Sequence, residues 1–185
     1  MPHKVCPWWL GYWLVCPVRR WWQDPAPIVA PYVRPGMTVL EPGPGMGYFT
    51  LELARLVGPS GRVVCVDLQQ QMLDRLKRRA AKAGLRDRLD IRLAPAESMA
   101  LDDLAGSVDF TLAFAVVHEF PDAKKFFAEV AGASKPGAAV LVAEPFPHVT
   151  RDVFEAQLQA AAACGMNLES RPEITRSLAA VLRRS

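Results

Sequence analysis

From Thr38 onward, short runs of apolar residues alternate with longer segments in which apolar and polar residues recur at helical spacing. The short runs predict buried strands and the longer segments predict amphipathic helices. The expected strands are Val39–Leu40, Val63–Val66, Ile91–Leu93, Val108–Phe114, Ala138–Ala143, Asn167–Arg171 and Leu178–Arg183. The expected helices are Tyr48–Val57, Gln70–Ala83, Asp122–Ala133 and Arg151–Cys164.

This order of elements predicts an α/β fold. Strands that alternate with helices form parallel sheets covered on both faces. The last two strands follow each other without a helix and are expected to be antiparallel neighbours. The sequence Lys135-Pro136-Gly137 predicts a turn before the fifth strand. We therefore expect a doubly wound, mostly parallel seven-stranded sheet with an antiparallel last strand and helices on both faces.

The charge balance gives little reason to expect a polyanionic partner. The formal net charge of the 185 residues is only +3. Much of the basic excess lies between Arg75 and Arg88, at helical spacing and without interleaved aromatic residues. Such a segment is typical of a solvated helix face, so nucleic-acid binding is not expected.

The four cysteines are scattered along the chain and form no Cys-x-x-Cys pair. Their spacing predicts neither a disulfide framework nor a metal site, so we expect reduced thiols and a cytoplasmic protein. No apolar run reaches the length of about 18 to 20 residues that spans a bilayer. The apolar segment Val5–Val18 is broken by prolines and lacks a small-residue cleavage site, so a signal peptide is not expected.

A glycine-rich segment follows the first expected strand. Glu41 ends that strand, and Gly43, Gly45 and Gly47 alternate strictly after it. In a doubly wound sheet, ligands bind at the carboxyl ends of strands near the point where the strand order reverses. The spacing does not match the Gly-x-Gly-x-x-Gly fingerprint of dinucleotide-binding proteins. A carboxylate so close to the turn would repel a pyrophosphate, and it suits a ligand with cationic groups.

A second acidic residue, Asp67, ends the second strand. A carboxylate at this place can accept hydrogen bonds from both hydroxyls of a ribose. Met72 lies one turn into the following helix. The combination is more specific than either feature alone and predicts a site for a nucleoside with a sulfonium group.

Three segments together resemble the class I S-adenosylmethionine-dependent methyltransferases, a Rossmann-like family of small-molecule methyltransferases. Val39–Thr50, with the sequence VLEPGPGMGYFT, resembles motif I of that family. Val63–Leu73, VVCVDLQQQML, resembles the segment that follows motif I, and Phe126–Pro145 resembles the helix, turn and fifth strand. The resemblance covers the chain from about Tyr32 to its end. It implies S-adenosylmethionine as cofactor and S-adenosylhomocysteine as product.

The resemblance also implies roles for individual residues. Glu41 and the backbone of the three glycines would hold the methionine part of the cofactor, and Asp67 the ribose. Leu68 and Met72 would pack on the adenine, and Ala96 would donate its backbone N–H to it. Phe114 would line the passage between cofactor and acceptor. The family often has an aspartate before the Ala96-Glu97 pair, where this chain has Pro95. Either Glu97 or a backbone carbonyl would then bind the adenine amine.

Methyl transfer needs alignment, a dry site and, for some acceptors, a base. His118 follows the fourth strand and His148 follows the fifth, so both are expected near the acceptor. Imidazole is the usual base near neutral pH, and both residues are therefore candidate catalytic residues. The alternative for His118 is that it only orients its loop.

The N-terminal segment is rich in tryptophan. Under the resemblance, the chain is one domain in which residues 1–31 form an arm or lid and residues 32–185 form the Rossmann-like core. The arm would then roof a small, partly apolar acceptor. It could instead pack on its own domain, or anchor the protein at a membrane surface through Trp8, Trp9 and Trp13. The oligomeric state cannot be read from the sequence.

Two functions of different classes remain after this reasoning. The first is a small-molecule methyltransferase, and the second is a non-catalytic S-adenosylmethionine-binding subunit with a regulatory or partner role. Both need the glycine turn and Asp67. A nicotinamide oxidoreductase is disfavoured by the glycine spacing.

Overall fold

The structure is a computed structural model and describes residues 23–95 and 98–185 of the chain. Its strands are β1 (Thr38–Pro42), β2 (Arg62–Asp67), β3 (Leu89–Leu93), β4 (Val108–Phe114), β5 (Ser134–Pro145), β6 (Met166–Ser170) and β7 (Ser177–Arg184). Its α-helices are α2 (Pro25–Val29), α3 (Thr50–Val57), α4 (Gln70–Lys82), α5 (Ala123–Ala133) and α6 (Arg151–Ala162). Short 3-10 helices are η3 (Arg86–Arg88), η4 (Asp102–Leu104) and η5 (Val117–Glu119).

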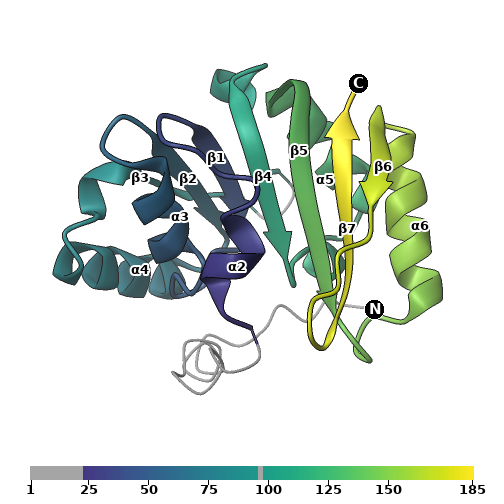
Figure 1. The fold of residues 1–185 in the computed structure, drawn as a ribbon, viewed down its shortest axis with the longest axis horizontal. Coiled ribbons are helices and arrows are strands. Elements are labelled where there is room, and N and C mark those ends of the chain that lie inside the picture. The colour runs from purple at the N-terminus through teal and green to yellow at the C-terminus, as the bar shows by residue number, and fades with distance from the viewer. Residues whose placement is uncertain (1–22, 96–97) are drawn as a thin grey trace.

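In the described part of the chain, seven strands form one sheet with the order β3-β2-β1-β4-β5-β7-β6. β1 to β5 are parallel, and β7 runs antiparallel to both of its neighbours, β5 and β6. Figure 1 shows the strands of this sheet side by side, with helices packed around them. The predicted fold class, with its antiparallel last strand, is confirmed.

The strand order reverses between β1 and β4, since the chain first adds β2 and β3 on one side and then crosses to the other. β1 pairs with β2 over its whole length, but with β4 only at Val39 and Leu40. The carboxyl ends of β1 and β4 therefore diverge beyond Leu40. This divergence opens the crevice in which doubly wound sheets bind ligands.

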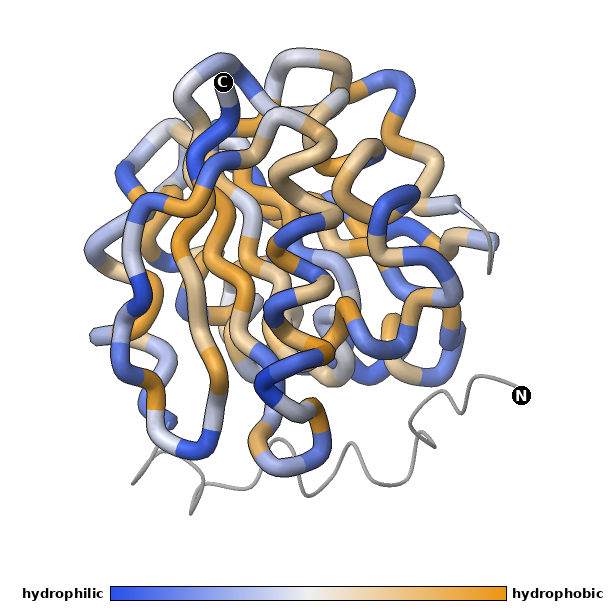
Figure 2. Tube along the Cα trace, turned by 90° about the vertical axis from the view of Figure 1, so that its right-hand side faces the viewer, coloured by the Kyte–Doolittle hydropathy of each residue, from blue (hydrophilic) through white to orange (hydrophobic). Residues whose placement is uncertain are grey.

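The sheet separates two hydrophobic cores. α2, α3 and α4 cover one face, with Val29, Leu53 and Leu76 fully buried. α5 and α6 cover the other face, where Phe127 and Phe154 are the large buried side chains. In Figure 2 the strands carry most of the hydrophobic colour and the surrounding loops most of the hydrophilic colour. The apolar runs of the sequence thus became strands because both of their faces are covered.

Local sequence signals fix several helix ends. The Asp122 side chain accepts hydrogen bonds from the backbone N–H groups of Lys124 and Lys125 at the start of α5. Thr150 caps α6 through Val153 N–H. Gly84 follows the end of α4 and has a positive φ of 68°. These caps satisfy backbone groups that a helix end leaves without partners.

The segment Lys135–Gly137 differs from its prediction as a turn, because β5 already begins at Ser134. The prediction had a physical basis: Val108 pairs with Ser134 and Phe110 with Ala139, so the intervening β5 residues form an irregularity in the register. Gly137 adopts a φ of 76° within it. Pro and Gly thus mark a bulge in a continuous strand here.

Other helix and strand boundaries differ from the predicted ones by a few residues. The helix expected from Tyr48 begins at Thr50, because residues 45–49 form turns. The strand expected from Ile91 begins at Leu89. The short helix α2, which the hydrophobic pattern did not predict, buries Val29 against the core.

Residues 1–22 of the predicted arm, which hold its tryptophans, lie outside the described residues, and residues 23–31 contain α2. The division into an arm and a core stays a prediction. None of the helices in residues 23–95 and 98–185 is long and apolar enough to span a membrane.

Candidate functional site

The glycine turn between β1 and α3 lies at the carboxyl edge of the sheet. Gly43 and Gly45 have positive φ angles of 62° and 53°, which side-chain-bearing residues rarely adopt. A Cβ atom on Gly43 would lie 2.6 Å from Val116 Cγ2, whereas one on Gly45 would meet nothing within 4 Å. Gly43 therefore permits close packing of the turn on the loop after β4. Gly45 borders open space.

Two contacts hold this turn in place. Gly43 N–H donates to Val66 O over 2.8 Å, which ties the turn to the end of β2. The half-buried guanidinium of Arg79, on α4, donates to Met46 O. The turn is thus fixed from β2 and from α4 before any ligand binds.

Glu41 lies at the end of β1 and only 4% of it is exposed. Its Oε2 atom has no hydrogen-bond partner among the described residues. Burial raises the pKa of Glu41 to about 8; the nearby Thr50 side chain opposes this shift and the negative charge of Asp67 reinforces it. A buried polar atom without a partner is costly, so this carboxyl group has a strong preference for a cationic or hydrogen-bonding ligand.

Asp67 lies at the end of β2, across from the glycine turn. Its Oδ2 accepts from Gly45 N–H at 3.3 Å and its Oδ1 from Gln69 N–H at 2.9 Å. Burial raises the pKa of Asp67, and the backbone N–H groups of Gln69 and Gly45 oppose this. Each carboxylate oxygen has more than one acceptor position, so Asp67 can also accept the two hydroxyls of a ribose.

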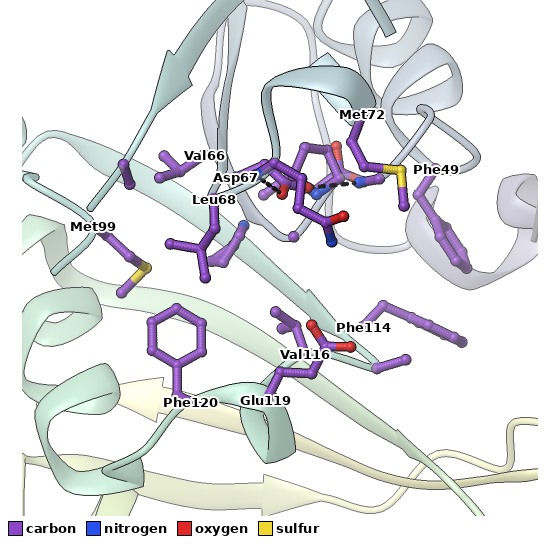
Figure 3. A pocket seen from close by; sticks show the side chains of 18 of the residues that line it. Phe49, Val66, Asp67, Leu68, Met72, Met99, Phe114, Val116, Glu119 and Phe120 are labelled. Carbon is purple, nitrogen blue, oxygen red and sulfur yellow. Dashed lines mark hydrogen bonds between the residues drawn. The ribbon is translucent and has the colours of Figure 1, made fainter. Parts of the chain in front are cut away.

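Glu41 and Asp67 border one cavity, which Figure 3 shows from close by. The cavity is lined by residues of the glycine turn, the ends of β2 and β4, and the loops after β3 and β4. These residues are Glu41, Pro42, Gly43, Pro44, Gly45, Met46, Tyr48, Phe49, Val66, Asp67, Leu68, Gln69, Met72, Ala94, Pro95, Ser98, Met99, Phe114, Ala115, Val116, Glu119, Phe120 and Pro121.

The cavity is mostly apolar and draws on both cores. Leu68, Met99 and Phe120 pack with the core on the α5 side of the sheet. Phe49 and Phe114 belong to the other core, with ring centroids 4.4 Å apart. In Figure 3 these two groups lie toward opposite sides of the cavity. The apolar walls can therefore hold a flat apolar part of a ligand, while Glu41 and Asp67 contact its charged and polar parts.

The structure brings together most of the cofactor residues predicted from the sequence. Glu41, Gly43, Gly45, Asp67, Leu68, Met72 and Phe114 all line the cavity. Gly47 does not line it, but packs against Leu76, whose Cδ1 atom a Cβ on Gly47 would overlap. Ala96 and Glu97 lie outside the described residues, so their adenine contacts stay predictions.

Sequence reasoning missed the cavity wall formed by Met99, Val116 and Phe120. These residues come from loops after β3 and β4 that carry no motif. The only available signal was their position beyond the carboxyl ends of the strands, which does not tell which side chains face the crevice.

The two predicted catalytic histidines lie close together, but neither is among the residues that line the cavity. The His118 and His148 rings meet edge-on with centroids 5.1 Å apart. His118 Nδ1 is hydrogen-bonded to Oε2 of Glu144, which is fully buried at the end of β5. Burial lowers the pKa of His118, but the hydrogen bond and negative charge of Glu144, helped by Glu119, outweigh it and raise the pKa above 6.5.

The arrangement fits the cofactor that the resemblance implies. The orphaned Glu41 oxygen and the glycine turn suit the charged methionine part, and Asp67 suits a ribose. The apolar wall of Leu68, Met72, Met99 and Phe120 suits an adenine ring. Two carboxylates at the turn disfavour a pyrophosphate, as the sequence indicated.

Comparison with known proteins identifies curated relatives that are methyltransferases. The ubiquinone/menaquinone biosynthesis C-methyltransferase of Brucella canis is 32% identical over 129 residues, which cover 69% of this chain and 47% of the relative. The arsenite methyltransferase of Halobacterium salinarum is 29% identical over 118 residues, or 61% of this chain and 29% of the relative. This chain spans less than half the length of these relatives.

A solved structure shares the fold over nearly the whole chain. The SAM-dependent methyltransferase from Aquifex aeolicus superimposes with a TM-score of 0.86 at 22% identity, covering 98% of this chain and all of the other. The methyltransferase domain family matches residues 40–142, which is more than half of the chain and contains most of β1, all of β2 to β4 and most of β5. The expected family is thereby confirmed: this chain belongs to the methyltransferase domain family of S-adenosylmethionine-dependent enzymes.

Proposed function

We propose that this protein is an S-adenosylmethionine-dependent methyltransferase that acts on a small, partly apolar acceptor. The observation that carries the proposal is the grouping of Glu41, the glycine turn and Asp67 around one cavity. Membership of the methyltransferase domain family supports the same activity. The proposal covers the cofactor side of the reaction more fully than the acceptor side.

The residues of the cavity would each have a distinct task. Glu41 and the turn from Gly43 to Gly47 would hold the methionine part of the cofactor, and Asp67 would bind the ribose hydroxyls. When bound, the cofactor supplies an activated methyl group. The chain's own contribution to the reaction is to align the acceptor and to exclude water, which accounts for much of the acceleration in displacement reactions.

The acceptor is expected at the side of the cavity formed by Tyr48, Phe49 and Phe114. The Tyr48 hydroxyl donates to Gln23 O at 2.8 Å, which fixes its ring near the start of the described chain. Aromatic walls favour an acceptor with apolar surface. The two curated relatives have different acceptors in their names, so they do not select one for this protein.

His118 and His148 are proposed to act on the acceptor side. They lie beyond the carboxyl ends of β4 and β5, next to the cavity wall at Val116 and Glu119. Either imidazole could take a proton from an acceptor that must lose one. The sequence also supports a cytoplasmic location and an N-terminal arm, residues 1–31, that roofs the acceptor.

Calorimetric titration with S-adenosylmethionine and S-adenosylhomocysteine tests the cofactor. Replacing Asp67 by Ala removes hydrogen bonds from a carboxylate to two hydroxyls and should weaken binding about a hundredfold. Asp87→Ala is the matched control, because Asp87 is exposed and lies outside the cavity. Absence of wild-type binding, with NAD tested in parallel, would contradict the proposal.

Activity is tested next, by following S-adenosylhomocysteine release with a panel of small aromatic and aliphatic acceptors that carry O, N, S or C nucleophiles. Turnover of any acceptor supports the enzyme. Tight cofactor binding without turnover across the panel would favour the non-catalytic binding subunit.

A further inference from the structure

A single buried carboxylate, that of Glu144, connects the end of β5 with the loop after β4. Its Oε1 accepts hydrogen bonds from the backbone N–H groups of Val116 at 3.3 Å and Val117 at 2.9 Å. Its Oε2 is bonded to Nδ1 of His118. Glu144 therefore engages three consecutive residues from a position 26 or more residues away in the sequence.

The first set of contacts fixes a wall of the cofactor cavity. Val116 lines the cavity, and its Cγ2 atom occupies the space that a Cβ on Gly43 would need. Glu119, two residues beyond Val117, also lines the cavity. By holding two backbone N–H groups, Glu144 sets where this turn lies against the glycine turn.

The second contact fixes the tautomer of an imidazole. A carboxylate can only accept, so His118 must donate its Nδ1 hydrogen to Glu144. In the neutral ring this leaves Nε2 as a hydrogen-bond acceptor, and Nε2 has no partner in residues 23–95 and 98–185. Besides Glu144, the titratable groups near this ring are Glu119 and His148.

A purely structural role would not require these groups. A fully buried carboxylate next to an imidazole is expensive to bury, and apolar side chains in place of both partners would stabilise a core at least as well. The same carboxylate–imidazole contact keeps a ring in one tautomer and stabilises its protonated form. The arrangement therefore indicates proton chemistry at Nε2 of His118, which lies in the chain between the cavity-lining residues Val116 and Glu119.

We propose that Glu144 is a positioning residue for methyl transfer. Its Oε1 atom holds the cavity wall at Val116 and Val117, and its Oε2 atom holds His118 in the tautomer whose Nε2 can accept a proton. This inference rests on the proposed function. The proton moves from the heteroatom of the acceptor to the lone pair of Nε2, and the electron pair of the broken bond stays on the acceptor. The resulting imidazolium faces the Glu144 carboxylate. His118, rather than His148, is the base.

Nitrogen-15 NMR of the histidine rings tests the assignment without an acceptor, because the ring nitrogen shifts report which nitrogen carries the hydrogen. In the wild type the neutral His118 ring is expected to carry it on Nδ1. In Glu144→Gln the amide oxygen can still accept from Val116 and Val117, while its NH₂ group donates to Nδ1. The hydrogen of the neutral ring should then move to Nε2, and the ring should titrate at lower pH.

Calorimetric measurement of S-adenosylhomocysteine binding tests whether Glu144 holds the cavity wall at Val116 and Val117. Glu144→Gln should bind within about threefold of the wild type, which corresponds to less than 1 kcal/mol. Glu144→Ala should bind about tenfold more weakly or worse, because both N–H groups lose their acceptor. Thr111→Val is the control: Thr111 is fully buried on β4 with no partner for its hydroxyl among described residues, and the change should affect neither measurement.

The outcomes separate this inference from the proposed function. Failure of the wild type to bind S-adenosylhomocysteine would remove the proposed function. Normal binding, together with a wild-type His118 that carries its hydrogen on Nε2, would overturn the assignment of His118 while leaving the function intact. Normal binding by a folded Glu144→Ala would overturn the role of Glu144 in the wall. The wild-type spectrum decides the tautomer even if a variant does not fold.

Discussion

Two buried glutamates lie at the carboxyl ends of β1 and β5, on either side of β4, and differ in their hydrogen bonds. Glu144, at the end of β5, is fully buried and has both oxygens bonded by the loop after β4. Glu41, at the end of β1, is almost as deeply buried, but its Oε2 has no partner in the described chain. Burial removes both carboxyl groups from water at a similar cost in free energy, so the difference lies in which groups supply the compensating hydrogen bonds. For Glu144 it is the protein itself, and for Glu41 it is left to a ligand.

The comparison separates two meanings of the same sequence feature. An acidic residue at the carboxyl end of a buried strand can stabilise the scaffold or await a ligand. Only the hydrogen-bond partners decide between these roles, so replacing Glu144 should destabilise the fold, whereas replacing Glu41 should weaken cofactor binding without destabilising the free protein.

The largest effect is expected for Glu144→Leu, which leaves the Val116 and Val117 N–H groups and the His118 ring without their acceptor. The free energy of unfolding should fall by about 3–5 kcal/mol, as when one partner of a buried ion pair is removed. Urea unfolding of the wild type and variant measures it. If Glu41→Leu destabilised the protein equally, the proposed distinction between the two carboxylates would be wrong.

A smaller effect, on cofactor affinity and not on stability, is expected for Glu41→Gln. It keeps the shape of the side chain and should leave the stability of the free protein equal or slightly higher. Above pH 8, where Glu41 of the wild type is ionised, affinity for S-adenosylmethionine should fall by about 1.5–3 kcal/mol, or roughly ten- to a hundredfold, because a charged hydrogen-bond acceptor is lost. Calorimetric titration checks this; unchanged affinity would show that Glu41 does not face the bound cofactor.

The smallest effect, for a change of one pH unit, is a dependence of stability on pH. The pKa of Glu41 is about 8 in the folded protein against 4.5 for an ordinary glutamate. Between these values the folded state binds more protons than the unfolded state, so stability falls as pH rises toward 8, by at most about 1.4 kcal/mol per pH unit. The raised pKa of His118 acts in the same direction above pH 6.5.

Comparison with Glu41→Gln isolates the contribution of Glu41. Unfolding by urea at several pH values between 5 and 8 should show a shallower loss of stability in the variant than in the wild type. Parallel curves would mean that Glu41 titrates normally. In the wild type, affinity for the cationic cofactor should rise over the same range, as the carboxylate forms.

The cofactor half of the site could be predicted from the sequence because its parts are local. Glu41, Gly43 and Gly45 follow one another, and Asp67 ends the next strand, so strand ends and a turn motif were sufficient. The parallel direction of β1 to β5 and the antiparallel β7 also followed from the alternation of elements. The bulge at Lys135–Gly137 was misread as a turn, since Pro and Gly mark both.

The rest of the candidate site depends on contacts between segments that are distant in the sequence. The pairing of His118 with Glu144 joins the loop after β4 to the end of β5, and needs the strand register to be known. The placement of Val116 and Phe120 depends on how the loop after β4 packs, which no periodicity encodes. Sequence reasoning placed both histidines at the correct edge of the sheet, but it did not see which one a carboxylate holds.

The position of β7 has a consequence for the biosynthesis of the protein. β7 follows β6 in the chain but lies between β5 and β6 in the sheet. During translation, β6 therefore leaves the ribosome before its pairing partner exists, and the edge of β5 stays open until Ser177–Arg184 has been made. The residues that line the cofactor cavity, between Glu41 and Pro121, are synthesised much earlier. The nascent chain must thus protect an unfinished sheet while the cavity elements are already present, and this interval is the step at which aggregation or chaperone binding is expected.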